Sequence, residues 1–213
     1  RCSSMMPKKK TNNGERARLM VAQEAARIIV NQGIRDYGLA KKKAAERLGL
    51  RGRGSLPGNA EIEQAVSEHL QLFAGDSHTD LLQTMRQAAL SAMEMLSPFT
   101  PRLVGPVLNG TADANSAVNL HVFADSAESV AHALDQNGLN YKPYERRLKS
   151  RRDRAETYAG FEFHHGEASV QATVFPVDGI RQAPISPVDG KPMKRADEKA
   201  VRELLHQRFS TGM

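Results

Sequence analysis

The chain has few of the residues that characterise small secreted or membrane proteins. Cys2 is the only cysteine among 213 residues, so no internal disulfide can form, and a reducing compartment is predicted. No apolar run approaches the roughly 20 residues that a transmembrane helix needs. The opening stretch, RCSSMMPKKK, also lacks the apolar core of a signal peptide. These absences predict a cytoplasmic protein with no membrane partner.

Aromatic residues are scarce as well. Tryptophan is missing, and phenylalanine, tyrosine and tryptophan together make up 5% of the chain. Only Tyr37 and Tyr144 lie close to basic stretches, so nucleic-acid bases would find few rings on which to stack. Any contact with nucleic acid is therefore predicted to involve phosphates rather than base edges.

Negative charge is sparse in the first quarter of the chain. Residues 1–57 carry 14 Lys and Arg against 4 Asp and Glu, whereas the whole chain has a net charge of +6. A second basic cluster, KPYERRLKSRRDR, covers residues 142–154. Such clusters indicate a polyanionic partner, because phosphate contacts release counterions; a solvated surface with a floppy tail is the alternative. The candidate nucleic-acid-binding residues are Lys41, Lys42, Lys43, Arg47, Arg51, Arg53, Arg146, Arg147, Lys149, Arg151 and Arg152.

The rest of the composition is that of a globular protein, with 40% hydrophobic and 25% charged residues. The polar residues 1–14 are predicted to form a disordered basic tail. Apolar residues then recur at helical spacing, which predicts a helical N-terminal region over residues 15–97. Its helices are expected at residues 15–32, 36–48, 60–73 and 78–96.

After Pro101 the apolar periodicity changes to that of strands. Strands are predicted at 102–108 and 117–123, separated by a turn, and a helix follows at 126–137. Three more strands are expected at 139–148, 156–165 and 168–177, the last two joined by the turn HGE, before a C-terminal helix at 197–208. This order predicts an α+β fold, in which the helical N-terminal region packs on a mixed β-sheet formed by residues 98–213.

Several motifs in the second half occur in a recognisable order. They are a Gly110-Thr111 turn, the strand SAVNLHVF at 116–123, the strand QATVFP at 171–176 and the loop DGKP at 189–192. Together they resemble the DNA polymerase β-like nucleotidyltransferase superfamily, and in particular small bacterial proteins of that type. The resemblance covers about residues 100–176 and implies a sheet of nucleotidyltransferase type.

The chain departs from this family at the positions that carry the chemistry. Members of the family have two carboxylates at i and i+2 of the first motif strand and a third on a neighbouring strand. Carboxylates on one face can hold two Mg²⁺ ions, which stabilise an in-line displacement at phosphorus. The corresponding residues here are Ala117, Asn119 and Gln171, all of them neutral. The resemblance therefore implies a pseudoenzyme that holds no metal and binds a nucleotide, or RNA or DNA phosphates, in a basic cleft.

The residues expected to contact a nucleotide follow from the same comparison. A Gly-Thr turn can bring backbone N–H groups and a hydroxyl against phosphates. Side chains on the face of Ala117 could add further contacts, although His121 could equally be a hydrogen-bonded core histidine. The candidate nucleotide-binding residues are Gly110, Thr111, Asn119, His121 and Lys191.

Two other functions stay open from the sequence alone. One is an active transferase that uses Mg²⁺ and has moved a carboxylate to Asp113, in the turn before the motif strand. The other is a structural or interaction protein, such as a homodimer, whose cleft is filled by side chains and binds no ligand.

Overall fold

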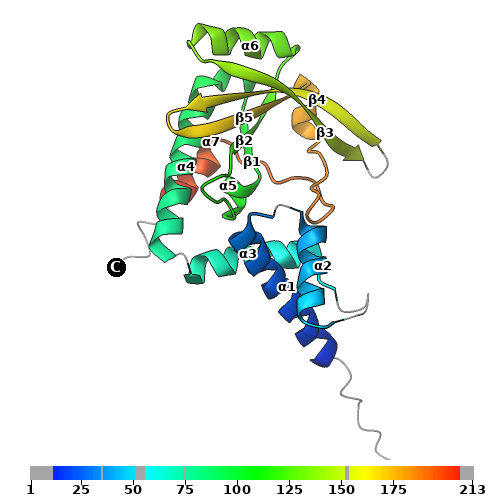
Figure 1. Cartoon of the computed structure of the whole chain (residues 1–213). Coiled ribbons are helices and arrows are strands. Elements are labelled where there is room, and N and C mark those ends of the chain that lie inside the picture. The colour runs from blue at the N-terminus through cyan, green and yellow to red at the C-terminus, as the bar shows by residue number, and fades with distance from the viewer. Residues whose placement is uncertain (1–11, 35, 51–55, 74, 152–153, 207–213) are drawn as a thin grey trace, which may run out of the picture. The chain divides into compact units, whose positions relative to one another are not determined.

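The computed structural model describes residues 12–34, 36–50, 56–73, 75–151 and 154–206 (Figure 1). Contacts divide the chain into two compact units, residues 1–73 and residues 74–213. From the sequence, this boundary is expected at 97/98. The fourth helix instead belongs to the second unit, because it packs on the sheet.

The first unit consists of three helices, all expected from the sequence. They are α1 (Asn12–Gln32), α2 (Tyr37–Arg47) and α3 (Asn59–Phe73). Asp36 begins α2 by accepting a hydrogen bond from the N–H of Leu39 at 3.0 Å, which satisfies one of the donors at the start of the helix. The core of the unit comes from the apolar stripes of all three helices, with Ile28, Ala44 and Ile62 fully buried.

The second unit contains one five-stranded mixed sheet. Its strands are β1 (Arg102–Val104), β2 (Val118–Phe123), β3 (Tyr141–Arg151), β4 (Arg154–His165) and β5 (Ala168–Phe175). They are ordered β1-β2-β5-β4-β3, and β2 and β5 are parallel while the other pairs are antiparallel. This arrangement confirms the α+β fold class.

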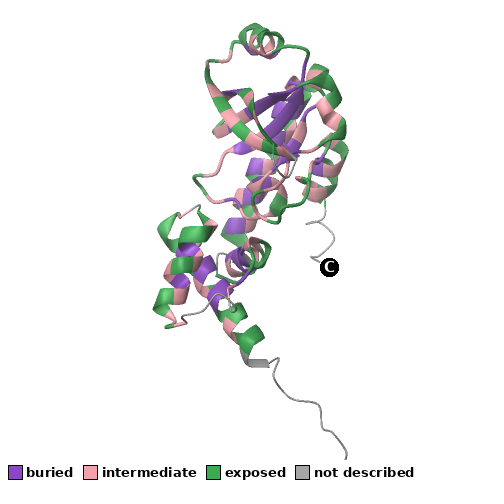
Figure 2. Ribbon diagram, turned by 90° about the vertical axis from the view of Figure 1, so that its right-hand side faces the viewer, coloured by how far each residue is buried: buried purple, intermediate pink, exposed green. Residues whose placement is uncertain are grey.

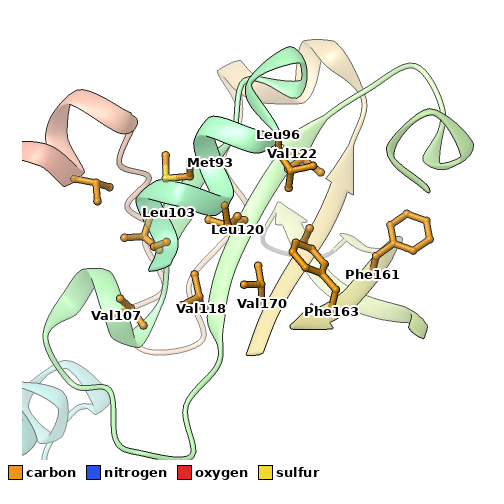
Figure 3. Packing of buried hydrophobic residues seen from close by; sticks show 14 of the residues in the cluster. Met93, Leu96, Leu103, Val107, Val118, Leu120, Val122, Phe161, Phe163 and Val170 are labelled. Atoms are coloured by element: carbon orange, nitrogen blue, oxygen red, sulfur yellow. The ribbon is translucent and has the colours of Figure 1, made fainter. Parts of the chain in front are cut away.

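Helices cover the apolar face of this sheet. They are α4 (Gly75–Met95), α6 (Ala127–Gln136) and α7 (Glu198–His206). Along β2, Val118, Leu120 and Val122 alternate with more polar residues, so the three aliphatic side chains share one face of the strand. They pack with Met93 of α4 and Phe163 of β4 in one core (Figure 3). Figure 2 shows the buried residues concentrated in the sheet and on the inner sides of helices.

One predicted strand is wrong over most of its length. Residues 102–108 were expected to be extended, but β1 ends at Val104 and a short helix, α5 (Pro106–Asn109), follows. Gly105 has a φ of 74°, which a glycine adopts without strain, and Pro106 suits the first position of a helix. The basic tail predicted at 1–14 falls mostly outside the described residues, and α1 includes its last three.

Two short 3₁₀ helices complete the second unit, η2 (Ser97–Phe99) and η3 (Val177–Arg181). Over the described ranges, no helix combines the length and the apolar character that crossing a bilayer would require.

Candidate functional site

The face of the sheet opposite the aliphatic core is polar where β2 and β5 run side by side. The register pairs Asn119 with Gln171 and His121 with Thr173, so these four side chains lie on one face of two neighbouring parallel strands. The structure thus brings together two of the three positions expected to have lost carboxylates. Ala117 precedes β2, and its carbonyl oxygen accepts a hydrogen bond from the Asn119 amide at 3.2 Å.

The guanidinium of Arg146 lies between the two amides. Its Nη1 donates to Oδ1 of Asn119 at 3.2 Å, and its Nη2 donates to Oε1 of Gln171 at 2.6 Å. Arg146 takes part in no ion pair of the described residues. A positive charge therefore occupies the place where the resemblance to nucleotidyltransferases would put magnesium. These residues do not fit a divalent cation, because amide oxygens carry no charge and the guanidinium would repel the ion.

The Tyr144 ring packs between Arg146 and Gly160. The Tyr144 ring crosses β4 at Gly160, and its hydroxyl is 2.8 Å from Oγ1 of Thr173 on β5. Gly160 is directly paired with Tyr144, and a Cβ there would come within 2.6 Å of the ring atom Cε2. The guanidinium carbon of Arg146 lies 5.3 Å from the centre of the Tyr144 ring, a cation–π contact. Burial raises the pKa of Tyr144 above its usual value.

Glu162 is a carboxylate on the same face that the sequence analysis missed. Its Oε2 accepts a hydrogen bond from Nε2 of Gln171 at 3.3 Å, and its Oε1 accepts one from the Ser169 hydroxyl, also at 3.3 Å. By holding the NH₂ group of Gln171, Glu162 directs the amide oxygen of that residue towards Arg146. The alternation in the segment Phe161-Glu162-Phe163 could have revealed it, since the two phenylalanines are buried on the other face.

His121 is a buried residue rather than an open ligand. Its side chain is 1% exposed, its ring lies 4.4 Å from that of Phe175, and its Nδ1 accepts a hydrogen bond from Nε of Arg195 at 3.1 Å. Burial, with the positive charges of Arg195 and Arg146, lowers the pKa of His121 to about 3. The imidazole is therefore neutral, which favours the core histidine among the two roles that the sequence left open.

Arg195 connects the loop before α7 to this face. Its Nη1 donates to the carbonyl oxygens of Gly179 and Ile180 at 2.8 and 3.3 Å, and its guanidinium lies about 5 Å from the rings of Phe123 and Phe175. Its Nη2 is buried without a hydrogen-bond partner in the described part of the chain. Burial, together with the charge of Arg102, lowers the pKa of Arg195 to about 10. It stays charged at neutral pH and adds to the positive potential of the face.

A pH dependence of stability follows from His121. Its pKa is about 3 in the folded chain, against about 6.5 for an unfolded histidine, so between these values only the unfolded chain takes up the proton. This contribution to stability is fully present above pH 6.5 and is lost as the pH falls towards 3. From pH 7.5 to pH 5 we expect the wild type to lose about 2 kcal/mol more than His121→Gln. Urea unfolding at both pH values measures this, and equal losses in the two proteins would contradict it.

The Gly110-Thr111 turn faces α4. Gly110 ends α5, and the N–H groups of both Gly110 and Thr111 donate to the carbonyl oxygen of Pro106. A Cβ on Gly110 would approach Arg86 of α4, at 3.9 Å. The glycine against Asn119 is instead Gly105, where a Cβ would lie 3.3 Å from Nδ2 of the asparagine. In the sequence, the Gly105-Pro106 pair directly after the apolar residues 103–104 could have indicated this glycine.

Asp113 and Lys191 are held in turns of their own. The Asp113 carboxylate accepts hydrogen bonds from the Asn115 N–H at 2.9 Å and from the Ser116 hydroxyl at 2.8 Å. The Lys191 side chain is exposed, and its backbone N–H donates to the Asp189 carboxylate at 3.1 Å. A metal site using Asp113 would have to draw this carboxylate out of its turn.

Most of the basic side chains predicted on α2 are already engaged within the first unit. Arg47 forms an ion pair with Glu24 at 3.0 Å, while Lys41 and Lys43 donate to the side-chain oxygens of Asn59 and Gln32. Lys42 is exposed, as are Arg147 and Lys149 on β3. Arg51, Arg53, Arg152 and the side chain of Arg151 lie outside the described residues.

Comparison of the chain with protein-family models, with curated proteins and with solved structures gave no match. In the described ranges, no group of three or more His, Cys, Asp or Glu side chains is arranged to hold a metal ion.

Proposed function

We propose that this protein binds the phosphates of a nucleotide without metal, on the polar face of its sheet, and that Arg146 is the main ligand. The observation that carries the proposal is the position of the Arg146 guanidinium. It is fixed by the amide oxygens of Asn119 and Gln171, and no ion pair of the described residues neutralises it.

The chemistry of arginine suits this role. A guanidinium has five N–H donors in one plane and can give two parallel hydrogen bonds to a phosphate. Arg146 uses one N–H for each amide oxygen, so donors remain for an incoming anion. Arg195 adds a second positive charge on the same face, which together with Arg146 outweighs the single negative charge of Glu162. The face therefore favours a ligand with several negative charges.

The protein proposed here is a degenerate nucleotidyltransferase rather than an active one. The metals of the family supply the stabilisation of the transferring phosphoryl group, and neutral side chains at positions 117, 119 and 171 leave nothing to hold them. A transferase with Asp113 as a metal ligand is less well supported, because that carboxylate has two hydrogen-bond partners in its own turn. The proposal includes the cytoplasmic location expected from the lone cysteine.

RNA or DNA phosphates are the larger ligands of the same class. Arg147 and Lys149 are exposed on the opposite face of β3 from Arg146, and because β3 is the edge strand, a longer chain could reach them by passing over that edge. Such contacts would be indifferent to sequence, because phosphates carry no base information.

Calorimetric titration with ATP in the presence of EDTA, and again with Mg²⁺, tests the proposal. We expect binding in both, and a loss of about 10- to 100-fold in affinity for Arg146→Gln, since a charged hydrogen-bond donor is removed. Arg147→Gln removes the same charge from an exposed neighbour and is the matched control, expected to change ATP affinity less than about threefold. The absence of ATP binding without metal, or an equal effect of the two substitutions, would contradict the proposal.

A further inference from the structure

The first half of β4 has a neighbouring strand on one side only, because β5 on its other side ends early. Strand β4 pairs with β5 only from Gly160 to His165, while residues 154–159 pair with β3 alone. Strand β5 ends at Phe175, and Pro176 then directs the chain into η3. Among the described residues, none of residues 154–159 is paired with a residue on the β5 side. Alternate N–H and C=O groups of this segment are therefore open on that side.

A cavity of about 1050 Å³ borders this open edge. Its walls are residues 156–159 of β4, residues 124–127 between β2 and α6, and residues 174–181 from the end of β5 through η3. We call this cavity the strand slot. It lies where β5 would continue if it were longer, because β4 lies on one side and the end of β2 on the other.

The two faces of the strand slot are closed by different elements. Helix α6 belongs to the layer on the apolar face, since Val130 and Leu134 are part of the core. The other wall, η3, lies towards the polar face, because Arg195 bonds the carbonyl oxygens of Gly179 and Ile180 there. A space in the plane of a sheet, with cover on both faces, has the shape of a β-strand.

The charged side chains at the rim favour a basic occupant. Asp125 stands on the α6 side and Asp178 on the η3 side, and both are exposed. Because successive side chains of a strand point to opposite faces, basic residues on both faces of an inserted strand would each meet a carboxylate. Glu156 in the wall is already paired with Arg154, and Arg181 is the cation at the rim. The apolar lining includes Val174, Phe175 and Ile180.

We propose that the strand slot receives an extended, basic segment of a partner protein as an additional strand along residues 154–159 of β4. Backbone hydrogen bonds to β4 would supply affinity, and the two carboxylates would select for basic side chains. This interaction is independent of the phosphate-binding face and does not need Arg146.

The test uses the full chain and a synthetic pentapeptide, Lys-Lys-Val-Lys-Lys, which places lysines on both faces of an inserted strand, with amide hydrogen exchange as the readout. We expect the peptide to slow exchange of alternate amides within 154–159 by at least about tenfold, as hydrogen-bonded amides are protected. Two matched peptides serve as controls: one with glutamate in place of each lysine, and one with proline at the central position. Neither is expected to protect these amides, because the first has the wrong charge and the second cannot pair as a strand.

A variant of the protein tests the charge argument without touching the edge. Asp125→Lys with Asp178→Lys should weaken Lys-Lys-Val-Lys-Lys binding about three- to tenfold at low salt. The inference is overturned if saturating peptide leaves residues 154–159 unprotected, or if the glutamate peptide protects them equally. Slow exchange of these amides in the chain alone would mean that a second copy or the chain itself fills the slot, which would also overturn it. Loss of ATP binding in Arg146→Gln has no bearing on this result.

Discussion

Replacing Gly160 with alanine is expected to destabilise the second unit by about 3 kcal/mol and to abolish ATP binding. The added methyl group would collide with the Tyr144 ring, with ring atom Cε2 at 2.6 Å and the hydroxyl oxygen at 2.7 Å. The ring has little freedom to move away, because its hydroxyl is bonded to Thr173 and Arg146 lies over it. Inserting a carbon into such packing costs about 1–3 kcal/mol, and a ring tethered at both ends puts this site at the upper limit.

The binding effect follows from the same contact. If Tyr144 is displaced, Arg146 loses the surface on which it rests and the geometry of its two amide bonds. Urea unfolding measures the first effect and calorimetry with ATP the second. Gly14→Ala is the matched control, since a Cβ at Gly14 meets nothing within 4 Å and alanine favours a helix. Restored stability in Gly160→Ala with Tyr144→Ala would assign the loss to this collision, whereas an unchanged single variant would contradict the argument.

Introducing carboxylates at two of the neutral positions is expected to abolish metal-free ATP binding. In Asn119→Asp with Gln171→Glu, both new carboxylates would lie within hydrogen-bond distance of the Arg146 guanidinium, at the places of the present amide oxygens. They would neutralise the arginine and repel phosphate, so we expect a loss of at least about 100-fold in ATP affinity. Calorimetry in EDTA measures this loss.

Two further variants make this result specific. Asn115→Asp with Gln182→Glu adds the same charge at exposed positions away from Arg146, and is expected to leave ATP affinity within about threefold of the wild type. Adding Arg146→Met to the carboxylate variant removes the guanidinium between the two acids. That triple variant should bind Mg²⁺, which the wild type should not, because two carboxylates on one face suit a hard cation. Unimpaired ATP binding by the double variant would show that Arg146 is not the phosphate ligand.

Much of the fold was predictable because the spacing of apolar residues along the sequence indicates which face of each helix or strand is buried. The alternation of Val118, Leu120 and Val122 with polar residues defined β2 and its buried face, and the helical stripes defined α1 to α4. The error at 102–108 arose because RLVGPVL is apolar throughout, and a short apolar run does not separate a strand from a buried turn of helix.

The candidate site was predictable only in part. The pairing of position 171 with position 119 was expected from the resemblance, and the register places the two side by side. Arg146 was expected to contact nucleic-acid phosphates, as one of seven cations between residues 142 and 154 that form one basic cluster. Side-chain alternation in β3 separates them: Arg146 lies over the polar face, while Arg147 is exposed. Glu162 could have been inferred from the alternation of Phe161, Glu162 and Phe163, whereas the role of Gly160 became visible only through its pairing with Tyr144 on β3.

The sequence by itself determined the classes of element, the layer of aliphatic residues and the neutral side chains at positions 117, 119 and 171, because these depend on residue type and local spacing. Only the tertiary structure decided that a guanidinium contacts two of them. Asn119, Arg146, Tyr144 and Gln171 come from three strands, and their contact depends on strand order and register, which long-range packing sets. For the same reason the open edge of β4 appears only when the ends of β4 and β5 are compared in space.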